Sequence, residues 1–190
     1  KELKIISNKE SLNIGFLPGS RLSEVKNLMV YFEYAYKYLL LKNIKTKIII
    51  PTLPHLKNKI YDYVKDWKIQ TIIITDYNEI ESNYLKMDKA IVCSGTASLE
   101  IAKRKIPQLI IYKFNFFTEM IAKPFINVKF ANIINIIENE MIIPELTNSQ
   151  LNKRSFLKHL DNLINNNDAN LNQIDKIMKT FNKIYTNQPP

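Results

Sequence analysis

Glycine is scarce in this chain, which has 3 glycines in 190 residues. Average usage would give roughly 13 in a chain of this length. Most tight turns must therefore be made by Asn, Asp and Pro. Each remaining glycine is expected where a Cβ atom cannot be tolerated. These positions are Gly15, Gly19 and Gly95.

Cysteine and histidine are also rare, and long apolar runs are missing. The single cysteine, Cys93, excludes an internal disulfide and fits a reducing cytoplasm. His55 and His159 stand apart, without the spacing of metal ligands, so we expect both to be structural and expect no metal and no cofactor. No run approaches the roughly 18 apolar residues of a membrane span, and we expect no signal peptide.

The charge is of one predominant sign. The chain has 27 Lys and Arg against 18 Asp and Glu, a formal net charge of +9, while 46% of its residues are hydrophobic. This composition is typical of a folded domain, and its basic balance suits an anionic partner: nucleic acid, a nucleotide sugar or an acidic membrane surface. The charge alone does not choose among these partners.

Short β-rich runs alternate with amphipathic helical stretches from residue 12 to about 113, which is the pattern of βαβ units. The runs are almost wholly apolar, so we expect strands covered on both faces. The predicted fold is α/β, a doubly wound, Rossmann-like parallel sheet. Strands are expected at 12–18, 45–51, 70–75, 89–93 and 108–112, with helices at 23–41, 55–67, 80–86 and 97–103.

The pattern loosens after Lys113. Residues 114–130 form an aromatic amphipathic stretch interrupted at Pro124, and residues 131–146 are expected to be loop or short strand pieces. Two helical stretches, 148–165 and 169–186, follow around an Asn-rich turn. We therefore predict an α/β domain over 1–146 and a helical extension over 147–190 that packs on it.

Two glycines mark strand–turn–helix junctions of similar composition. The first is GFLPGSRLSE, in which Gly19 and Ser20 form a turn and Arg21 projects from the loop. A helix N-terminus preceded by glycine favours an anion, and a guanidinium can grip phosphate oxygens. The bland alternative is a capped turn with a surface arginine.

The second junction, SGTASLE, repeats this arrangement after the fourth predicted strand, three crossovers later. Ser94 and Thr96 flank Gly95 at a predicted helix start, and Glu100 lies one turn beyond Thr96 on the same helix face, where it would suit a ribose diol. The alternative is a Ser or Thr N-cap with a solvated Glu100. Neither junction has the sequence of a Walker A loop or of GxGxxG.

The phrases LPGSRLSEV, CSGTASLE, IIYK, ANIIN and PEL, in this order and spacing, resemble the C-terminal half of lipid-A-disaccharide synthase, a GT-B glycosyltransferase. The resemblance runs from about Leu12 to Leu146. The chain departs from it at Ala131, where the family has Pro, and at Thr147-Asn148. By position, the resemblance implies substrate-binding roles for Gly19, Ser20, Arg21, Glu24, Ser94, Gly95, Thr96, Glu100, Asn132 and Glu145.

The resemblance implies a donor-binding half-enzyme. This half would bind the UDP moiety of UDP-2,3-diacylglucosamine. Gly19, Ser20 and Arg21 would face the diphosphate, together with Ser94, Gly95 and Thr96. The sugar would pass to 2,3-diacylglucosamine 1-phosphate, held by a separate N-terminal acceptor domain that also carries the catalytic groups. That half is absent from this sequence, so the chain is expected to be inactive alone. The resemblance also implies that the transfer reaction needs no metal.

Two further expectations concern partners and place. Aromatic and lysine residues over 113–130 can form a patch for peripheral contact with an anionic membrane, which would place the protein in the cytoplasm on the inner face of the inner membrane. The alternative is that these aromatic residues pack under the C-terminal helices. The alternatives to the synthase are another GT-B glycosyltransferase, a UDP-sugar epimerase half, or a non-catalytic basic module that binds nucleotide or RNA. For the RNA case, Tyr31, Tyr34, Tyr36 and Tyr38 could stack bases, although packing is the favoured role, and we expect no nucleic-acid partner.

Overall fold

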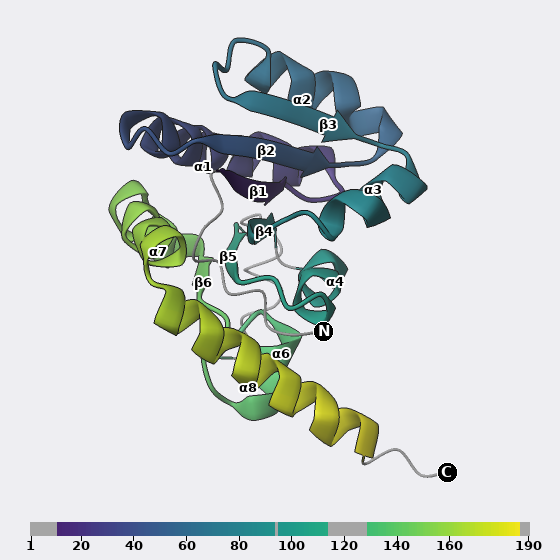
Figure 1. Ribbon diagram of the computed structural model, residues 1–190, viewed down its shortest axis with the longest axis vertical. Helices are drawn as coiled ribbons and strands as arrows, with labels where there is room; N and C mark the ends of the chain where they lie inside the picture. Colours follow the sequence, from purple (N-terminus) through teal and green to yellow (C-terminus); the bar gives the residue numbers. More distant parts are fainter. Residues whose placement is uncertain (1–10, 94, 114–128, 187–190) are drawn as a thin grey trace.

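The computed structural model describes residues 11–93, 95–113 and 129–186 (Figure 1). Its strands are β1 (Leu12–Leu17), β2 (Thr46–Pro51), β3 (Gln70–Ile74), β4 (Lys89–Cys93), β5 (Gln108–Tyr112) and β6 (Glu145–Thr147). Its helices are α1 (Leu22–Leu41), α2 (Lys57–Val64), α3 (Tyr77–Tyr84), α4 (Thr96–Lys103), α6 (Ile133–Glu138), α7 (Lys153–Asn165) and α8 (Asn167–Thr186), with short 3-10 turns at Pro54–Leu56 and Asn148–Gln150.

The strands form one sheet in the order β3-β2-β1-β4-β5-β6, and every described pair is parallel. The chain moves outward from β1 to β2 and β3, then returns to the other side of β1 with β4. The order therefore reverses between β1 and β4. In open α/β sheets, ligands bind outside the carboxyl ends of the strands at such a reversal.

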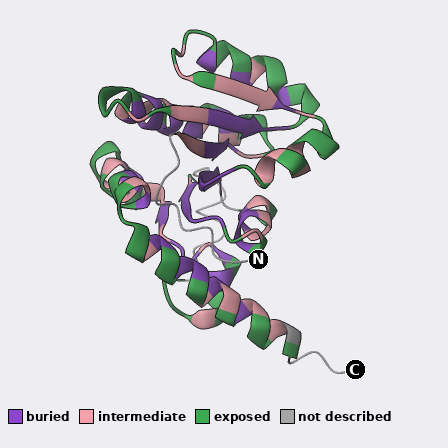
Figure 2. Cartoon of the chain, viewed as in Figure 1, coloured by how far each residue is buried: buried purple, intermediate pink, exposed green. Residues whose placement is uncertain are grey.

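Both faces of the sheet are covered, as the apolar strand runs predict. Alternate residues of one strand enter different cores: Ile48 and Ile50 pack on the α1 side, while Ile49 packs on the α3 and α4 side. Helices α1, α2 and α7 supply the first core, α3 and α4 the second, and α4, α6 and α8 a third. Figure 2 shows the strands mostly buried and the outer helix faces exposed.

The predicted doubly wound parallel sheet is confirmed, and five predicted strands match the observed ones to within one residue. The prediction missed α6, within a segment expected to be loop or strand. This helix has six residues, begins after the N-cap Asn132 and ends at Asn139 with φ of 50°. Local asparagine capping, not a long apolar period, defines it.

The C-terminal helices lie against the sheet and its other helices. Helix α7 packs on α1 and β5, and α8 packs on α4, α6 and α7 (Figure 1). Strand β6 crosses the predicted boundary between residues 146 and 147 and pairs with β5. The division into two units stays a prediction.

The tyrosines of α1 take the packing role. Tyr31 is buried and donates its hydroxyl to the Leu151 carbonyl oxygen at 2.7 Å, and Tyr36 stacks on Trp67 with ring centroids 4.6 Å apart. The Tyr38 hydroxyl donates to Asp161 at 2.6 Å. These three rings are therefore engaged inside the molecule.

Candidate functional site

A cavity of about 370 Å³ opens where the strand order reverses. It lies at the carboxyl ends of β1, β2 and β4 and between the first turns of α1 and α4. Its lining consists of Leu17, Gly19, Ser20, Arg21, Glu24, Pro51, Thr52, Leu53, Ile80, Tyr84, Cys93, Gly95, Thr96 and Ala97. Both predicted glycine turns thus meet at one cavity.

The first turn is held by its own carboxylate. Gly19 has φ of +107°, which L side chains rarely adopt. Glu24, in the first turn of α1, accepts the backbone N–H groups of Ser20 at 2.8 Å and Arg21 at 3.1 Å. The Arg21 guanidinium contacts the same carboxylate at 3.4 Å, yet 75% of the Arg21 side chain is exposed. Glu24 fixes the loop while Arg21 remains at the cavity mouth.

The second turn leaves open space. Gly95 is the N-cap of α4 with φ of 144°, and a Cβ built on it would meet nothing within 4 Å. The Ser98 hydroxyl donates to the Gly95 carbonyl oxygen at 2.8 Å and so supports the turn from behind. Thr96 lines the cavity, whereas the predicted site residue Ser94 lies outside the described residues.

Gly15 lies within β1, outside the cavity lining, and has a packing role there. A Cβ on Gly15 would lie 2.5 Å from the Met87 sulfur, so the glycine lets the Met87 side chain pack closely against β1. Only the other two glycines reach the cavity lining.

Glu100 lies on α4 but outside the cavity lining. Its carboxylate accepts from the Arg104 guanidinium at 2.7 Å, and Arg104 also pairs with Glu81 of α3. The guanidinium lies 5.0 Å from the ring centroid of Tyr84, which does line the cavity. Glu100 therefore reaches the site only through this cluster in the present arrangement.

Asn132 and Glu145 are buried away from this cavity. Glu145 accepts the backbone N–H of Asn132 and that of Ala131, both at 2.8 Å. The Asn132 side chain donates to the Ser98 hydroxyl at 2.9 Å and caps α6 by accepting from Ile134. Asn132 and Glu145 thus link α6 and β6 to Ser98, which supports the Gly95 turn. The described hydrogen bonds of Asn132 and Glu145 are all made within the chain.

Sequence reasoning missed the far wall of the cavity. Thr52 and Leu53 follow β2, and Ile80 and Tyr84 come from α3. Cys93 also lines the cavity, and burial raises the pKa of its thiol to about 12. No motif marks Thr52, Leu53, Ile80 or Tyr84, because their proximity to the glycine turns depends on strand order and not on sequence spacing.

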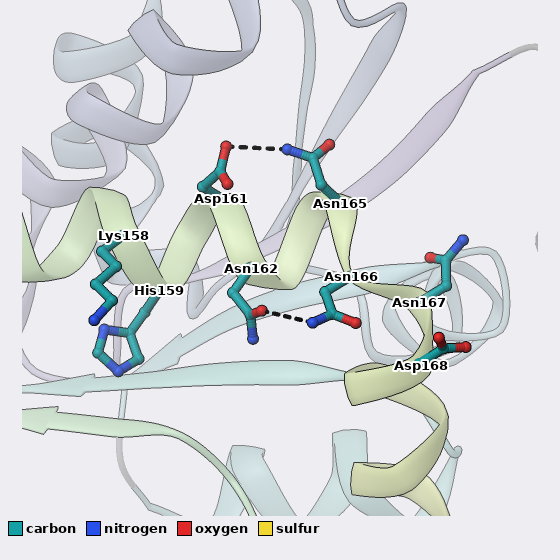
Figure 3. Close-up of a pocket in the computed structure, with 8 residues that line it drawn as sticks. All are labelled: Lys158, His159, Asp161, Asn162, Asn165, Asn166, Asn167 and Asp168. Carbon is teal, nitrogen blue, oxygen red and sulfur yellow. Dashed lines mark hydrogen bonds between the residues drawn. The ribbon is translucent and has the colours of Figure 1, made fainter.

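A larger cavity, about 720 Å³, lies at the α7–α8 turn and contains Asn and Asp side chains (Figure 3). Four of its side chains form two hydrogen-bonded pairs: Asn165 donates to Asp161, and Asn166 donates to Asn162, both at 3.0 Å. The α7 carbonyl of Leu163 accepts from Lys89, which begins β4, so this cavity borders the amino ends of the strands. It lies opposite the edge where α/β sheets bind ligands.

Other features of the described residues bear on partners. They contain no group of three or more His, Cys, Asp or Glu side chains able to hold a metal ion. None of their helices has the length and apolarity needed to cross a membrane. Most of the predicted aromatic membrane patch, including Phe116 and Phe117, falls outside them. Phe130 is buried and so is not part of an exposed patch.

Comparison with known proteins identifies the same family as the sequence motifs at the cavity. A family model described as lipid-A-disaccharide synthetase matches residues 1–188. The chain belongs to this family. The resemblance carried by the LPGSR and SGTASLE phrases is thereby confirmed.

Two synthases that are similar to this chain are longer than it. Lipid-A-disaccharide synthase 1 of Legionella pneumophila subsp. pneumophila strain Philadelphia 1 is 31% identical over 176 residues, which cover 92% of this chain and 45% of the relative. The synthase of Rhodospirillum centenum is 27% identical over 161 residues, 85% of this chain and 40% of the relative. The chain thus spans less than half the length of these relatives.

Solved structures agree with the GT-B fold of this family. WaaG, a glycosyltransferase involved in lipopolysaccharide biosynthesis, aligns with a TM-score of 0.59 at 10% identity, covering 89% of this chain and 42% of WaaG. The C-terminal domain of a group 1 glycosyltransferase (LpcC) from Francisella tularensis aligns at 0.54 and 19% identity, over 93% and 87%. The S. aureus MnaA–UDP structure aligns at 0.52 and 12% identity, over 88% and 40%.

Proposed function

We propose that this chain is the donor-binding half of a lipid-A-disaccharide synthase. It would bind the UDP moiety of UDP-2,3-diacylglucosamine, whose sugar passes to 2,3-diacylglucosamine 1-phosphate in lipid A biosynthesis. The observation that carries the proposal is the cavity at the strand reversal, bounded by Gly19 and Gly95 in positive-φ turns before α1 and α4. Family membership and a UDP-bound relative in fold support it.

The diphosphate is expected between the two turns. At each turn a positive-φ glycine brings the backbone close to the cavity, and the following helix directs its N-terminal dipole there. Arg21 at the mouth would grip phosphate oxygens in its exposed fork. Glu24 would not bind the ligand directly: its carboxylate holds the Ser20 and Arg21 backbone, which keeps the turn rigid before the anion arrives.

The proposed chemistry is substitution at the sugar's anomeric carbon. The acceptor's 6-hydroxyl would form the new bond as the bond to the UDP oxygen breaks, with inversion, and UDP would leave as an anion. Preorganised donors lower this barrier because they are already oriented toward the developing charge. Arg21 and the Gly95–Thr96 turn would supply that stabilisation, while the acid and base would come from the N-terminal half.

The partners and location follow from this proposal. The chain would pair with an N-terminal acceptor domain, on the same polypeptide or a separate one, and would be inactive alone. Since both sugars carry acyl chains, the complex would work in the cytoplasm against the inner face of the inner membrane. The net charge of +9 would favour an anionic lipid surface.

Calorimetric titration with UDP tests the binding step. We expect Arg21→Ala to weaken UDP binding by about 10- to 100-fold, the loss of one or two charge-assisted hydrogen bonds. Arg154→Ala is the matched control, because Arg154 is an exposed arginine on α7 and away from the cavity. Failure of the unaltered chain to bind UDP would refute the proposal.

Transfer itself requires the missing half. With the acceptor domain of a family member supplied, we expect formation of the disaccharide, and none with the chain alone. In that complex Arg21→Ala should cost about 2 to 4 kcal/mol of transition-state stabilisation, the effect of losing one preorganised donor. Unchanged turnover would count against the role given to Arg21.

A further inference from the structure

Thr52 carries a buried hydroxyl at the wall of the cavity. Its side chain lines the cavity, and the residue is 6% exposed. The Oγ1 atom is buried and has no hydrogen-bond partner among the described residues. Buried polar atoms of native proteins are nearly always paired, so an unpaired hydroxyl in a cavity wall indicates a partner that arrives from outside.

Other threonines on neighbouring strands show the usual solution. The Thr46 hydroxyl donates to the Ile44 carbonyl oxygen at 2.8 Å, and the Thr71 hydroxyl donates to that of Ile69 at 2.9 Å. The backbone N–H of Thr52 donates to the Ile74 carbonyl oxygen at 2.8 Å, which fixes the main chain at the end of β2. Unlike the other two threonines, Thr52 has no side-chain hydrogen bond to a described residue.

Thr52 is distinctive among the unpaired groups. The other buried side-chain atoms without partners in the described residues are Arg104 Nε, Gln108 Oε1 and Glu138 Oε1, and none of these residues lines this cavity. The unpaired Thr52 hydroxyl therefore coincides with the site found independently from the strand reversal and the glycine turns.

The position of Thr52 also limits which part of a ligand it meets. The Gly19 turn and Arg21 follow β1, and the Gly95 turn follows β4 and precedes α4. Thr52 follows β2, which lies one strand further out in the sheet. Its neighbours along that wall are apolar or aromatic: Leu53, Ile80 and Tyr84. An anion gains little from this wall, while an uncharged, flat and polar group fits it.

We infer that Thr52 is a ligand-binding residue whose hydroxyl hydrogen-bonds the uncharged nucleoside part of the bound nucleotide. The inference rests on the proposed function, because it takes the diphosphate to lie between the glycine turns. It adds a contact on the β2 and α3 side that family position did not suggest. Thr52 is assigned to binding and takes no part in bond breaking.

Thr52→Val removes the hydroxyl and keeps the shape of the side chain. We expect it to weaken UDP binding by about 3- to 10-fold, the effect of one neutral hydrogen bond, with inorganic pyrophosphate binding unchanged. Thr52→Ser should retain UDP binding to within about twofold. Thr71→Val, which alters a threonine whose hydroxyl is paired outside the cavity, should leave UDP binding unchanged.

Stability gives a second, independent measurement. Without ligand, Thr52→Val replaces an unpaired buried hydroxyl by a methyl group and should raise the Tm by about 2 to 4 °C. Thr71→Val breaks a hydrogen bond and should lower the Tm. A gain in stability together with a loss of UDP affinity is expected for a ligand-binding hydroxyl and not for a structural one.

The outcomes separate the two proposals. If the unaltered chain binds neither UDP nor pyrophosphate, the proposed function fails, and this inference with it. If the chain binds UDP and Thr52→Val binds it equally well, only the role of Thr52 is overturned. If Thr52→Val weakens pyrophosphate as much as UDP, the assignment to the nucleoside is wrong.

Discussion

Gly19 and Glu24 should be energetically coupled, because one leaves space that the other occupies. A Cβ on Gly19 would lie 2.3 Å from Glu24 Oε2 and 2.8 Å from Glu24 Cβ. The same Oε2 accepts the backbone N–H groups of Ser20 and Arg21. Gly19→Ala must therefore push the carboxylate off the turn, in addition to straining a backbone with φ of +107°.

The magnitudes follow from these two effects. A non-glycine residue in such a conformation costs about 1 to 3 kcal/mol. Losing the carboxylate that caps the turn costs about 0.5 to 2 kcal/mol. Gly19→Ala should thus lower the free energy of unfolding by roughly 1.5 to 5 kcal/mol. Glu24→Ala alone should lower it by the second amount.

A double-mutant cycle in urea measures the coupling. In the double variant the carboxylate is already gone, so the alanine at position 19 no longer meets Glu24 Oε2, and what remains is the backbone strain and the 2.8 Å approach to the Cβ of position 24. The double variant should be about 0.5 to 2 kcal/mol more stable than the sum of the single changes predicts. Gly95→Ala, where an added Cβ meets nothing within 4 Å, is the control and should be additive with Glu24→Ala. Additivity between Gly19→Ala and Glu24→Ala would refute the contact.

Three other predictions test the surroundings of the site. The Lys89 ammonium donates hydrogen bonds to the last carbonyl groups of α7, so Lys89→Met should destabilise the chain. Burial lowers the pKa of Lys89 to about 8, so between pH 8 and 10.5 the unfolded state alone retains the proton and the stability advantage of the unaltered chain over Lys89→Met should grow with pH. A stability difference that shrinks over this range in urea titrations would contradict this sign. Because the Cys93 thiol has a pKa raised to about 12, iodoacetamide at pH 8 should alkylate it at least tenfold more slowly than in the urea-unfolded chain, as mass spectrometry would show. Arg104→Met breaks its pairs with Glu81 and Glu100 and its contact with the Tyr84 ring, and should lower the unfolding free energy by about 1 to 2 kcal/mol, less at high salt; an unchanged urea midpoint would show that the cluster contributes nothing.

The sheet was predictable because its signal is local. Almost wholly apolar runs such as QLIIY become strands buried on both faces, and the bounds of the strands follow directly. The glycine turns were also visible, since few glycines remain and two require positive φ. By contrast, Asn132 begins a helix too short to have a hydrophobic period, and only its cap reveals it.

The rest of the site depends on strand order. Thr52 and Tyr84 meet the glycine turns only because β2 lies beside β1 and α3 packs over that side of the sheet. Apolar strand runs carry no information about which strand neighbours which. The burial of Glu145 could not be read either, because its partners are backbone N–H groups at Ala131 and Asn132, which any residue type supplies.

Titration of the isotopically labelled chain with UDP, followed by amide NMR, tests the central claim most directly. We predict that UDP shifts the amide signals of Gly19, Ser20, Arg21, Gly95 and Thr96 together, and that Gly95→Val, which fills the open space at the second turn, abolishes these shifts while most other signals stay in place. Shifts confined to the α7–α8 turn, or UDP binding that survives Gly95→Val unchanged, would contradict the account.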